Sequence, residues 1–172
     1  FMMFVISRAS IQRIYEVLME EPDIVSPENA SAQVTDGSVS FKNVSFSYFK
    51  DMDNLALEHI DLDIKSGETV GIIGGTGSSK TSLVQLIPRL YDATDGEVFV
   101  GGHNVKEYDI ETLRSEVAMV LQKNVLFSGT IRDNLKWGNE NATDEEIIDA
   151  CKSACAHDFI ESFPDGYDTD LG

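Results

Sequence analysis

Residues 70–87 read "VGIIGGTGSSKTSLVQLI", an apolar run followed by a glycine-rich turn and by Lys80 and Thr81 at the start of an apolar helical pattern. A buried strand that ends in such a loop and opens a helix aims several backbone N–H groups into one concavity, where an anion binds. The usual form of this loop is G-x-x-x-x-G-K-[ST]. The stretch therefore predicts a phosphate-binding loop, with Ser79 in place of the second glycine.

The residue types in this loop suit a nucleotide and a metal ion. Gly74, Gly75 and Gly77 allow the backbone to approach an anion closely and to adopt φ > 0 where a turn needs it. The Lys80 ammonium would reach the outer phosphates, and the Thr81 hydroxyl would ligate Mg²⁺. The alternative, a glycine-rich turn with a surface lysine, does not explain the flanking strand and helix patterns. We expect nucleotide contacts from Gly74, Gly75, Thr76, Gly77, Ser78, Ser79, Lys80, Thr81 and Ser82.

The effect of Ser79 depends on its backbone conformation. If its φ is negative, serine costs little and can add a hydroxyl donor. If its φ is positive, serine costs about 1–2 kcal/mol relative to glycine. That strain is small against a site with many hydrogen bonds, so we expect weaker binding rather than none.

The pattern around the loop predicts an α/β fold. Residues 38–48, 59–64 and 95–102 alternate as half-buried strands, the first with a break at Lys42-Asn43 and the last in a hairpin. The apolar runs 69–74 and 117–122 do not alternate, which favours strands of a parallel sheet buried on both faces. Helices are expected over 83–90, weakened by Pro88, and over 109–117, 130–138 and from Thr143, which forms a capping box with Glu146.

The first 37 residues differ from the rest. Residues 7–20 have helical spacing, and Pro22 and Pro27 precede a polar linker, so the compact domain should span residues 38–172. The apolar start "FMMFVI" fits either a core-facing helix or the end of a longer apolar helix, and we favour the second.

Composition excludes several classes of protein. The 172 residues carry 13 Lys and Arg against 30 Asp and Glu, a net charge of −17, which argues against nucleic acid as a partner. No stretch is apolar enough to span a bilayer. Cys151 and Cys155 should be reduced and on one side of a helix, because His157 alone does not complete a metal site. The histidines His59, His103 and His157 are expected at the surface.

Several longer segments resemble one family, the nucleotide-binding domain of exporter-type ATP-binding cassette (ABC) transporters. They are "ISRASIQRIYEVLMEEPDI", "VSFKNVSFSY", "GIIGGTGSSKTSL", "DGEVFVGGHNVKEYDIETLRSEVAMVLQKNVLFSGTIRDNL" and "GYDTDLG", and the resemblance runs over essentially the whole chain. The resemblance implies a partial P-loop NTPase core with an antiparallel β subdomain and the start of a helical subdomain. It also implies that residues 1–37 link the last transmembrane helix to the ATPase domain.

The same resemblance implies functional residues beyond the loop. Tyr48, which alone would be an ordinary strand aromatic, matches the residue that stacks on adenine. Gln122, alone an ordinary loop residue, matches the glutamine that completes the Mg²⁺ shell or positions water, so Gln122 and Lys80 are the implied catalytic residues. ATP and Mg²⁺ are the implied cofactors. The implied partners are a transmembrane domain of the same chain and a second ATP-binding domain, identical or different, at the cytoplasmic face of a bacterial membrane.

Some motifs of the family do not occur here: the Leu-Ser-Gly-Gly-Gln signature, the Walker B aspartate with its catalytic glutamate, and the switch histidine. We therefore expect these residues alone to bind nucleotide without hydrolysing it, and to be truncated before the signature. Without a Walker B strand, the runs 69–74 and 117–122 would leave an apolar edge open and the chain marginally stable. A degenerate ATP-binding module, supported by Ser79, is the main alternative. A soluble P-loop kinase leaves the N-terminal linker unexplained.

Overall fold

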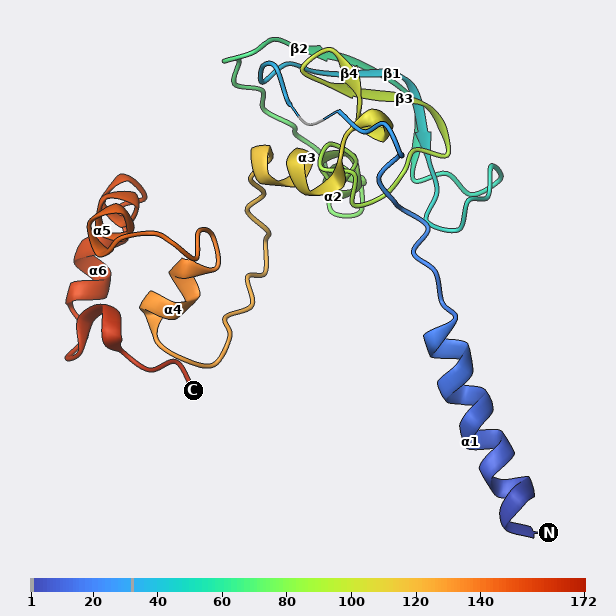
Figure 1. The fold of residues 1–172 in the computed structure, drawn as a ribbon. Coiled ribbons are helices and arrows are strands. Elements are labelled where there is room, and N and C mark those ends of the chain that lie inside the picture. Colours follow the sequence, from blue (N-terminus) through green and yellow to red (C-terminus); the bar gives the residue numbers. More distant parts are fainter. Residues whose placement is uncertain (1, 32) are drawn as a thin grey trace. The chain divides into compact units, whose positions relative to one another are not determined.

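The computed structural model describes residues 2–31 and 33–172, which form two compact units. The first unit runs to Ala118 and holds the sheet, and the second runs from Met119 to Gly172 and is helical (Figure 1). This mixed α/β architecture, with an antiparallel sheet and a separate helical part, confirms the fold class expected from the sequence.

The sheet has four strands in the order β2-β1-β3-β4, and all neighbours are antiparallel. The strands are β1 (Val39–Phe46), β2 (Leu57–Ile64), β3 (Asp95–Val100) and β4 (His103–Asn104). The first three overlap the three alternating segments of the sequence, and β4 begins directly after the third segment. Period-two patterns therefore located β1, β2 and β3, because these strands are half-buried over most of their length; at the end of β1, Val44, Ser45 and Phe46 are all buried.

The break predicted at Lys42-Asn43 is a β-bulge in β1. The pairing of β1 with β2 shifts in register between Phe41 and Val44, and Asn43 has φ of 50°. On the other side of β1, strand β3 accommodates the bulge through Gly96, because a Cβ atom there would lie 2.3 Å from the Asn43 carbonyl oxygen. The predicted hairpin is also present, with Gly101 and Gly102 at positive φ between β3 and β4, as two-residue hairpins favour.

One face of the sheet packs against α2 (Lys80–Gln85) and α3 (Ile110–Glu116), with a short 3₁₀ turn, η1 (Val105–Glu107), before α3 (Figure 1). The fully buried Tyr108 donates its hydroxyl to the Val100 carbonyl oxygen at 2.8 Å. The buried core of this unit is Phe41, Val44, Phe46, Leu57, Leu86, Val98, Val100, Val105, Tyr108 and Leu113.

Helix α2 is shorter than the three turns expected from the sequence. It ends at Gln85, and residues 86–90 continue as turns in which the amides of Leu86, Ile87 and Arg89 bond three residues back. Pro88 explains this ending, since proline lacks an amide hydrogen and disfavours the α conformation of the residue before it.

The two predicted parallel strands are wrong. Within the described residues, neither 69–74 nor 117–122 forms a strand, and Ile73 and Val120 are 99% and 90% exposed. A strand buried on both faces needs hydrogen-bonded neighbours, and the strands of the described sheet pair only with one another. The open strand edge expected from the sequence is therefore not observed in the described residues; large apolar side chains such as Ile73 and Val120 are exposed instead, while Val117 packs partly buried against the core.

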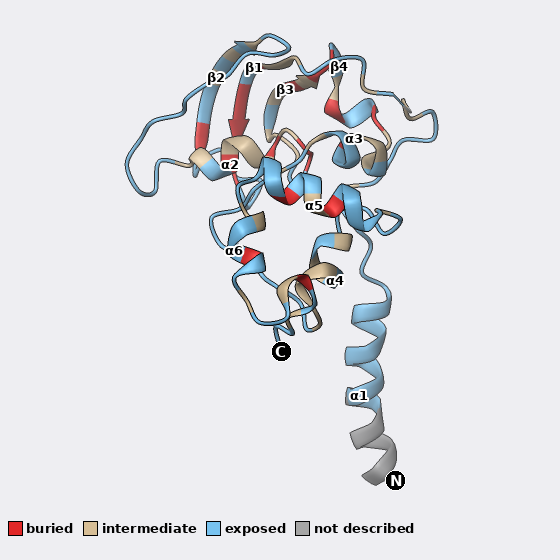
Figure 2. Cartoon of the chain, turned by 90° about the vertical axis from the view of Figure 1, so that its left-hand side faces the viewer, coloured by how far each residue is buried: buried red, intermediate tan, exposed pale blue. Residues whose placement is uncertain are grey.

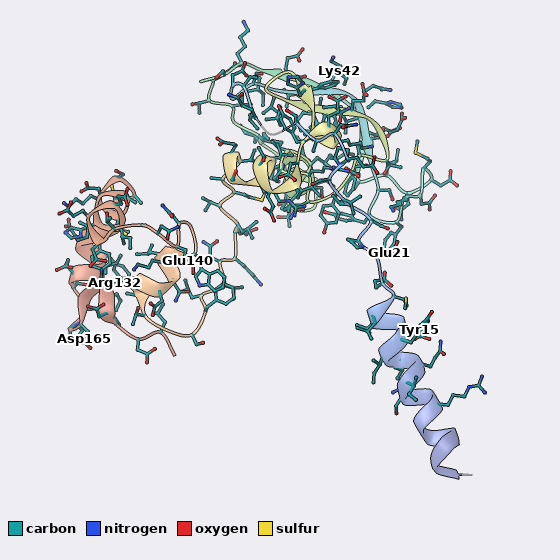
Figure 3. The ribbon with its side chains drawn as sticks, viewed as in Figure 1. Tyr15, Glu21, Lys42, Arg132, Glu140 and Asp165 are labelled. Atoms are coloured by element: carbon teal, nitrogen blue, oxygen red, sulfur yellow. The ribbon has the colours of Figure 1, made fainter. Side chains whose placement is uncertain are left out.

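The N-terminal helix α1 spans Met2–Leu18 rather than residues 7–20. On this helix Ile11, Ile14, Tyr15, Val17 and Leu18 are exposed, and Tyr15, labelled in Figure 3, projects away from the helix. Among the described helices, none combines the length and apolar character that crossing a membrane requires.

The second unit is built from α4 (Ile131–Lys136), α5 (Asp144–Ser153), α6 (His157–Glu161) and the 3₁₀ turn η2 (Gly166–Asp168). Thr143 and Glu146 form the predicted capping box at the start of α5, and Thr130 and Asp133 form a second one on α4. Arg132 on α4 bridges Asp144 at 2.6 Å and Asp168 at 3.0 Å, tying the elements together (Figure 3).

The buried residues of this unit, marked in Figure 2, are Ile147, Cys151, Ile160 and Tyr167. Both cysteines are free, as expected, but Cys155 lies beyond the end of α5 in a left-handed conformation, so the two do not share the helix. Burial, then a hydrogen bond with Cys151, raises the pKa of Tyr167 to about 12.

The three histidines differ in their surroundings. His59 and His103 are exposed, as predicted. His157 is half-buried and its Nδ1 atom lies 2.9 Å from the Tyr167 hydroxyl, so the expectation of a plain surface residue is wrong there. It is the first residue of α6, and its contact with Tyr167 was not indicated by the sequence around it.

Candidate functional site

The glycine-rich loop of residues 74–79 is closed by its own hydrogen bonds. Ser78 bonds the Gly75 carbonyl oxygen through both its amide, at 3.3 Å, and its hydroxyl, at 2.9 Å. A Cβ atom on Gly74 would lie 2.5 Å from the Ser78 Oγ atom, and Gly77 has φ of +84°. A side chain at 74 would therefore displace the Ser78 hydroxyl, and the backbone conformation at 77 favours glycine.

Lys80 begins α2 and folds back over this loop. Its ammonium donates to the carbonyl oxygens of Gly74 at 2.8 Å and Gly75 at 2.7 Å, and to Ser78 Oγ at 3.0 Å. An ammonium has three donors, and all three are used inside the loop. A phosphate oxygen arriving at this lysine must therefore replace one of these acceptors.

Ser79 has φ of 56° and ψ of 23°, the left-handed conformation. Of the two possibilities left open by the sequence, this is the costly one, with a strain of about 1–2 kcal/mol relative to glycine. The residue stands at the N-cap of α2, yet its side chain makes no capping hydrogen bond. Serine at this position therefore gains nothing from the contacts that usually favour it before a helix.

Tyr48 lies beside the loop helix. Its hydroxyl is 2.6 Å from the Oγ atom of Ser82, which is buried on α2. The ring meets Phe46 edge-on at 4.8 Å and Tyr91 edge-on at 5.2 Å between centroids. Tyr48 is 50% exposed, so an aromatic ring that is held by Ser82 and two neighbouring rings faces solvent next to the phosphate-binding loop.

Tyr91 is a member of this aromatic cluster that the sequence did not reveal. It follows the turn after α2, and its ring also lies 5.5 Å from that of Phe46. No periodicity marks it, because the position is set by the turn at Pro88 rather than by a strand or helix.

The remaining predicted site residues belong to two units that are described separately. Thr76 and Thr81 are exposed on the loop and on the first turn of α2. Gln122 is exposed near the start of the second unit, which the structure describes separately from the unit that holds Lys80. In the described part of the chain, no group of three or more His, Cys, Asp or Glu residues could hold a metal ion. The Mg²⁺ site at Thr81 and Gln122 stays a prediction.

The part of the sequence that carries the loop and Lys80 matches a family model. Residues 57–169, about two thirds of the chain, match the model described as ABC transporter. The chain belongs to the ABC transporter family. Membership of this family implies ATP binding.

Individual relatives agree with the family. The chain is 46% identical over 167 residues to YgaD of Bacillus subtilis (strain 168), named as a candidate multidrug export ATP-binding/permease protein. It is 41% identical over 172 residues to ABC transporter B family member 2 of Dictyostelium discoideum. These alignments cover 96% and 98% of this chain, but 29% and 12% of the relatives.

A solved structure of a bacterial Atm1-family ABC exporter with ATP bound also matches, with a TM-score of 0.87 and 31% identity. The match covers 94% of this chain and 28% of that exporter. The exporter-type resemblance read from the sequence is thus confirmed, and the chain spans less than a third of these relatives.

Proposed function

We propose that this chain is the ATP-binding part of a membrane exporter that couples ATP binding and hydrolysis to transport. The observation that carries the proposal is the combination of a closed glycine-rich loop, Lys80 at its end and the exposed ring of Tyr48 beside it. The relatives named as ATP-binding/permease exporters support the same function.

In this proposal each part of the site has one task. The loop amides and Lys80 hold the phosphates, the Thr81 hydroxyl offers the hard oxygen ligand that Mg²⁺ prefers, and Tyr48 stacks on the adenine ring. Gln122 ligates the same Mg²⁺ or positions the attacking water. A bound Mg²⁺ would supply charge neutralisation between the phosphates.

Binding of Mg-ATP to the chain, followed by fluorescence of a labelled ATP, tests this assignment. Lys80→Ala should weaken binding about tenfold or more, because it removes a charge-assisted hydrogen bond to phosphate. Lys106→Ala removes the same charge from the exposed turn η1 and is the matched control. Equal affinities for the two variants would contradict the proposal.

The names and lengths of the relatives support a proposal about the partners of this site. We propose a permease part in the same polypeptide and a second ATP-binding domain, with the site at the cytoplasmic face of the membrane. Co-purification of the intact protein as a dimer that crosslinks through this domain when ATP is added would support the arrangement. A strictly monomeric protein with ATP turnover would contradict it.

A second candidate is a module that binds ATP without hydrolysing it, and the left-handed Ser79 is the observation that favours it. Turnover of ATP by the intact protein separates the two. Hydrolysis that is lost in Lys80→Ala supports the exporter ATPase. Equal background rates in the parent protein and in Lys80→Ala support the non-hydrolysing module.

A further inference from the structure

Arg89 is a buried cation in the turn that follows α2. It is 6% exposed and has φ of 52°. Its Nε and one terminal nitrogen donate to the two Asp92 carboxylate oxygens at 2.8 Å and 3.3 Å. Its other terminal nitrogen donates to the carbonyl oxygen of Val25 at 3.2 Å. Val25 in the linker thus supplies an acceptor for the one terminal nitrogen of Arg89 that does not bond to Asp92.

The turn that carries Arg89 is fixed on its other side by α3. Arg114 donates to the carbonyl oxygens of Pro88 at 3.2 Å and Arg89 at 2.8 Å. The amide of Leu90 donates to the carbonyl of Gln85, the last residue of α2. The turn that holds Arg89 is therefore hydrogen-bonded to the end of α2, the short helix that begins with Lys80.

Residues 23–31, here called the strap, have further anchors next to this turn. The Ser26 hydroxyl donates to Asp109 at 2.9 Å and accepts the amide hydrogen of Ile110 at 2.9 Å, at the start of α3. The amide of Ser31 donates to the Glu107 carbonyl at 2.7 Å, and its carbonyl accepts from the Asp109 amide at 3.0 Å.

The pKa of the Asp109 carboxylate is affected by its contact with Ser26 of the strap. Its pKa is lowered from the ordinary value, first by the amide hydrogen of Thr112 and then by the Ser26 hydroxyl. Both donors hold the ionised carboxylate at the N-cap of α3, so the strap and the helix share one anchor.

We propose that Arg89 is a positioning residue for the nucleotide loop, and that the strap holds it in place from the linker. Displacing the strap removes the Val25 acceptor from a buried guanidinium and frees the turn that ends α2. Because coupling of two binding events is reciprocal, nucleotide in the loop must in turn stabilise the docked strap. The inference rests on the proposed nucleotide site.

The exposed ion pair between Lys50 and Asp23 supplies a control. It joins the same strap to the sheet unit at 2.8 Å, but both side chains are largely exposed. Ser26 is exposed too, so a strap that merely covers the surface would depend on the ion pair as much as on Ser26. A positioning role depends on Ser26 and not on the ion pair, because Ser26 bonds the start of α3, and Arg114 of α3 holds the turn of Arg89.

Two measurements on the full chain test the proposal: the dissociation constant of Mg-ATP, and hydrogen exchange of the Ser31 and Ile110 amides with and without Mg-ATP. In the parent chain, Mg-ATP should slow exchange of both amides about threefold or more. Ser26→Ala should speed their exchange and weaken Mg-ATP binding about threefold, while Lys50→Ala changes neither.

Arg89→Lys keeps the charge but loses the fork that reaches Asp92 and Val25 together, so it should behave like Ser26→Ala. If Ser26→Ala binds Mg-ATP as the parent chain does, or if nucleotide leaves exchange unchanged, the strap is only a cover and the proposal is overturned. A parent chain that binds no Mg-ATP overturns the proposed function itself, which is a different result from normal binding in all variants.

Discussion

The antiparallel sheet and the apolar run of residues 69–74 lie next to each other in the sequence and behave in opposite ways. In the sheet, alternating residues such as Val98 and Val100 are buried, and each strand has its partners in the chain. The run is more uniformly apolar, yet Ile73 is 99% exposed. Apolar character alone therefore does not bury a segment, because a strand also needs partners for its backbone amides and carbonyls.

The candidate site joins these two regions. Tyr48 follows β1 and is fixed by the sheet and by Ser82, whereas the loop from Gly74 follows the unpaired run. The base-binding half thus stands on an ordered scaffold, and the phosphate-binding half is organised mainly by its own hydrogen bonds.

The largest effect is expected when the contrast between sheet and run is probed directly. Phe41→Ala should destabilise the chain by about 3–5 kcal/mol, because it opens a cavity in the core of the sheet. Ile73→Ala should change the free energy of unfolding by less than about 0.5 kcal/mol. Urea unfolding followed by circular dichroism measures both. A large loss of stability in Ile73→Ala would show that the run is buried in solution.

A smaller effect is expected at the base-binding half. Tyr48→Ala should weaken Mg-ATP binding by about 1–3 kcal/mol, the range for stacking of a base on an aromatic ring. Tyr48→Phe keeps the ring and loses only the hydrogen bond to Ser82, so it should retain most of the affinity. Isothermal titration of both variants decides the point, and equal losses in the two would assign the effect to the hydroxyl rather than to stacking.

A still smaller effect is expected at the phosphate-binding half. Ser79→Gly removes a side chain from the left-handed region and should tighten Mg-ATP binding at least about twofold, roughly 0.4 kcal/mol. Ser79→Ala retains the strain and loses only the hydroxyl, so it is the matched control. A gain below twofold in Ser79→Gly would show that backbone strain does not limit binding.

The smallest effect is expected in the second unit, which is stabilised by local caps rather than by a sheet. The amide and then the hydroxyl of Thr143 lower the pKa of Glu146 from its ordinary value of 4.5. A lowered pKa in the folded state means that the contribution is present above pH 4.5 and is lost as the pH falls through the folded-state pKa. Glu146→Gln, which does not titrate, should therefore lose less α-helical signal than the parent chain on acidification below pH 4.5, measured by circular dichroism. Identical acid profiles would remove the capping carboxylate as the cause.

The sequence predicted those features that a few neighbouring residues determine. The β-bulge at Lys42-Asn43, the capping box at Thr143 and the two-glycine hairpin all appear where their local chemistry places them. The strands predicted over 69–74 and 117–122 were wrong because a continuous apolar run indicates a preference for burial but does not show which strand would pair with it. The length of α2 was overestimated because the apolar spacing continued past Pro88.

By itself the sequence determined the phosphate-binding loop and the alternating strands, because each depends on the spacing of neighbouring residues. It also determined the family, because the matching segments are spread along the whole chain. Only the tertiary structure decided that Ser79 is left-handed, that Tyr48 bonds Ser82 across 34 residues, and that Arg89 bonds Val25 across 64. The physical reason is that local periodicity and turn chemistry depend on neighbours in the chain. Contacts between distant residues depend instead on where the folded backbone brings their polar atoms.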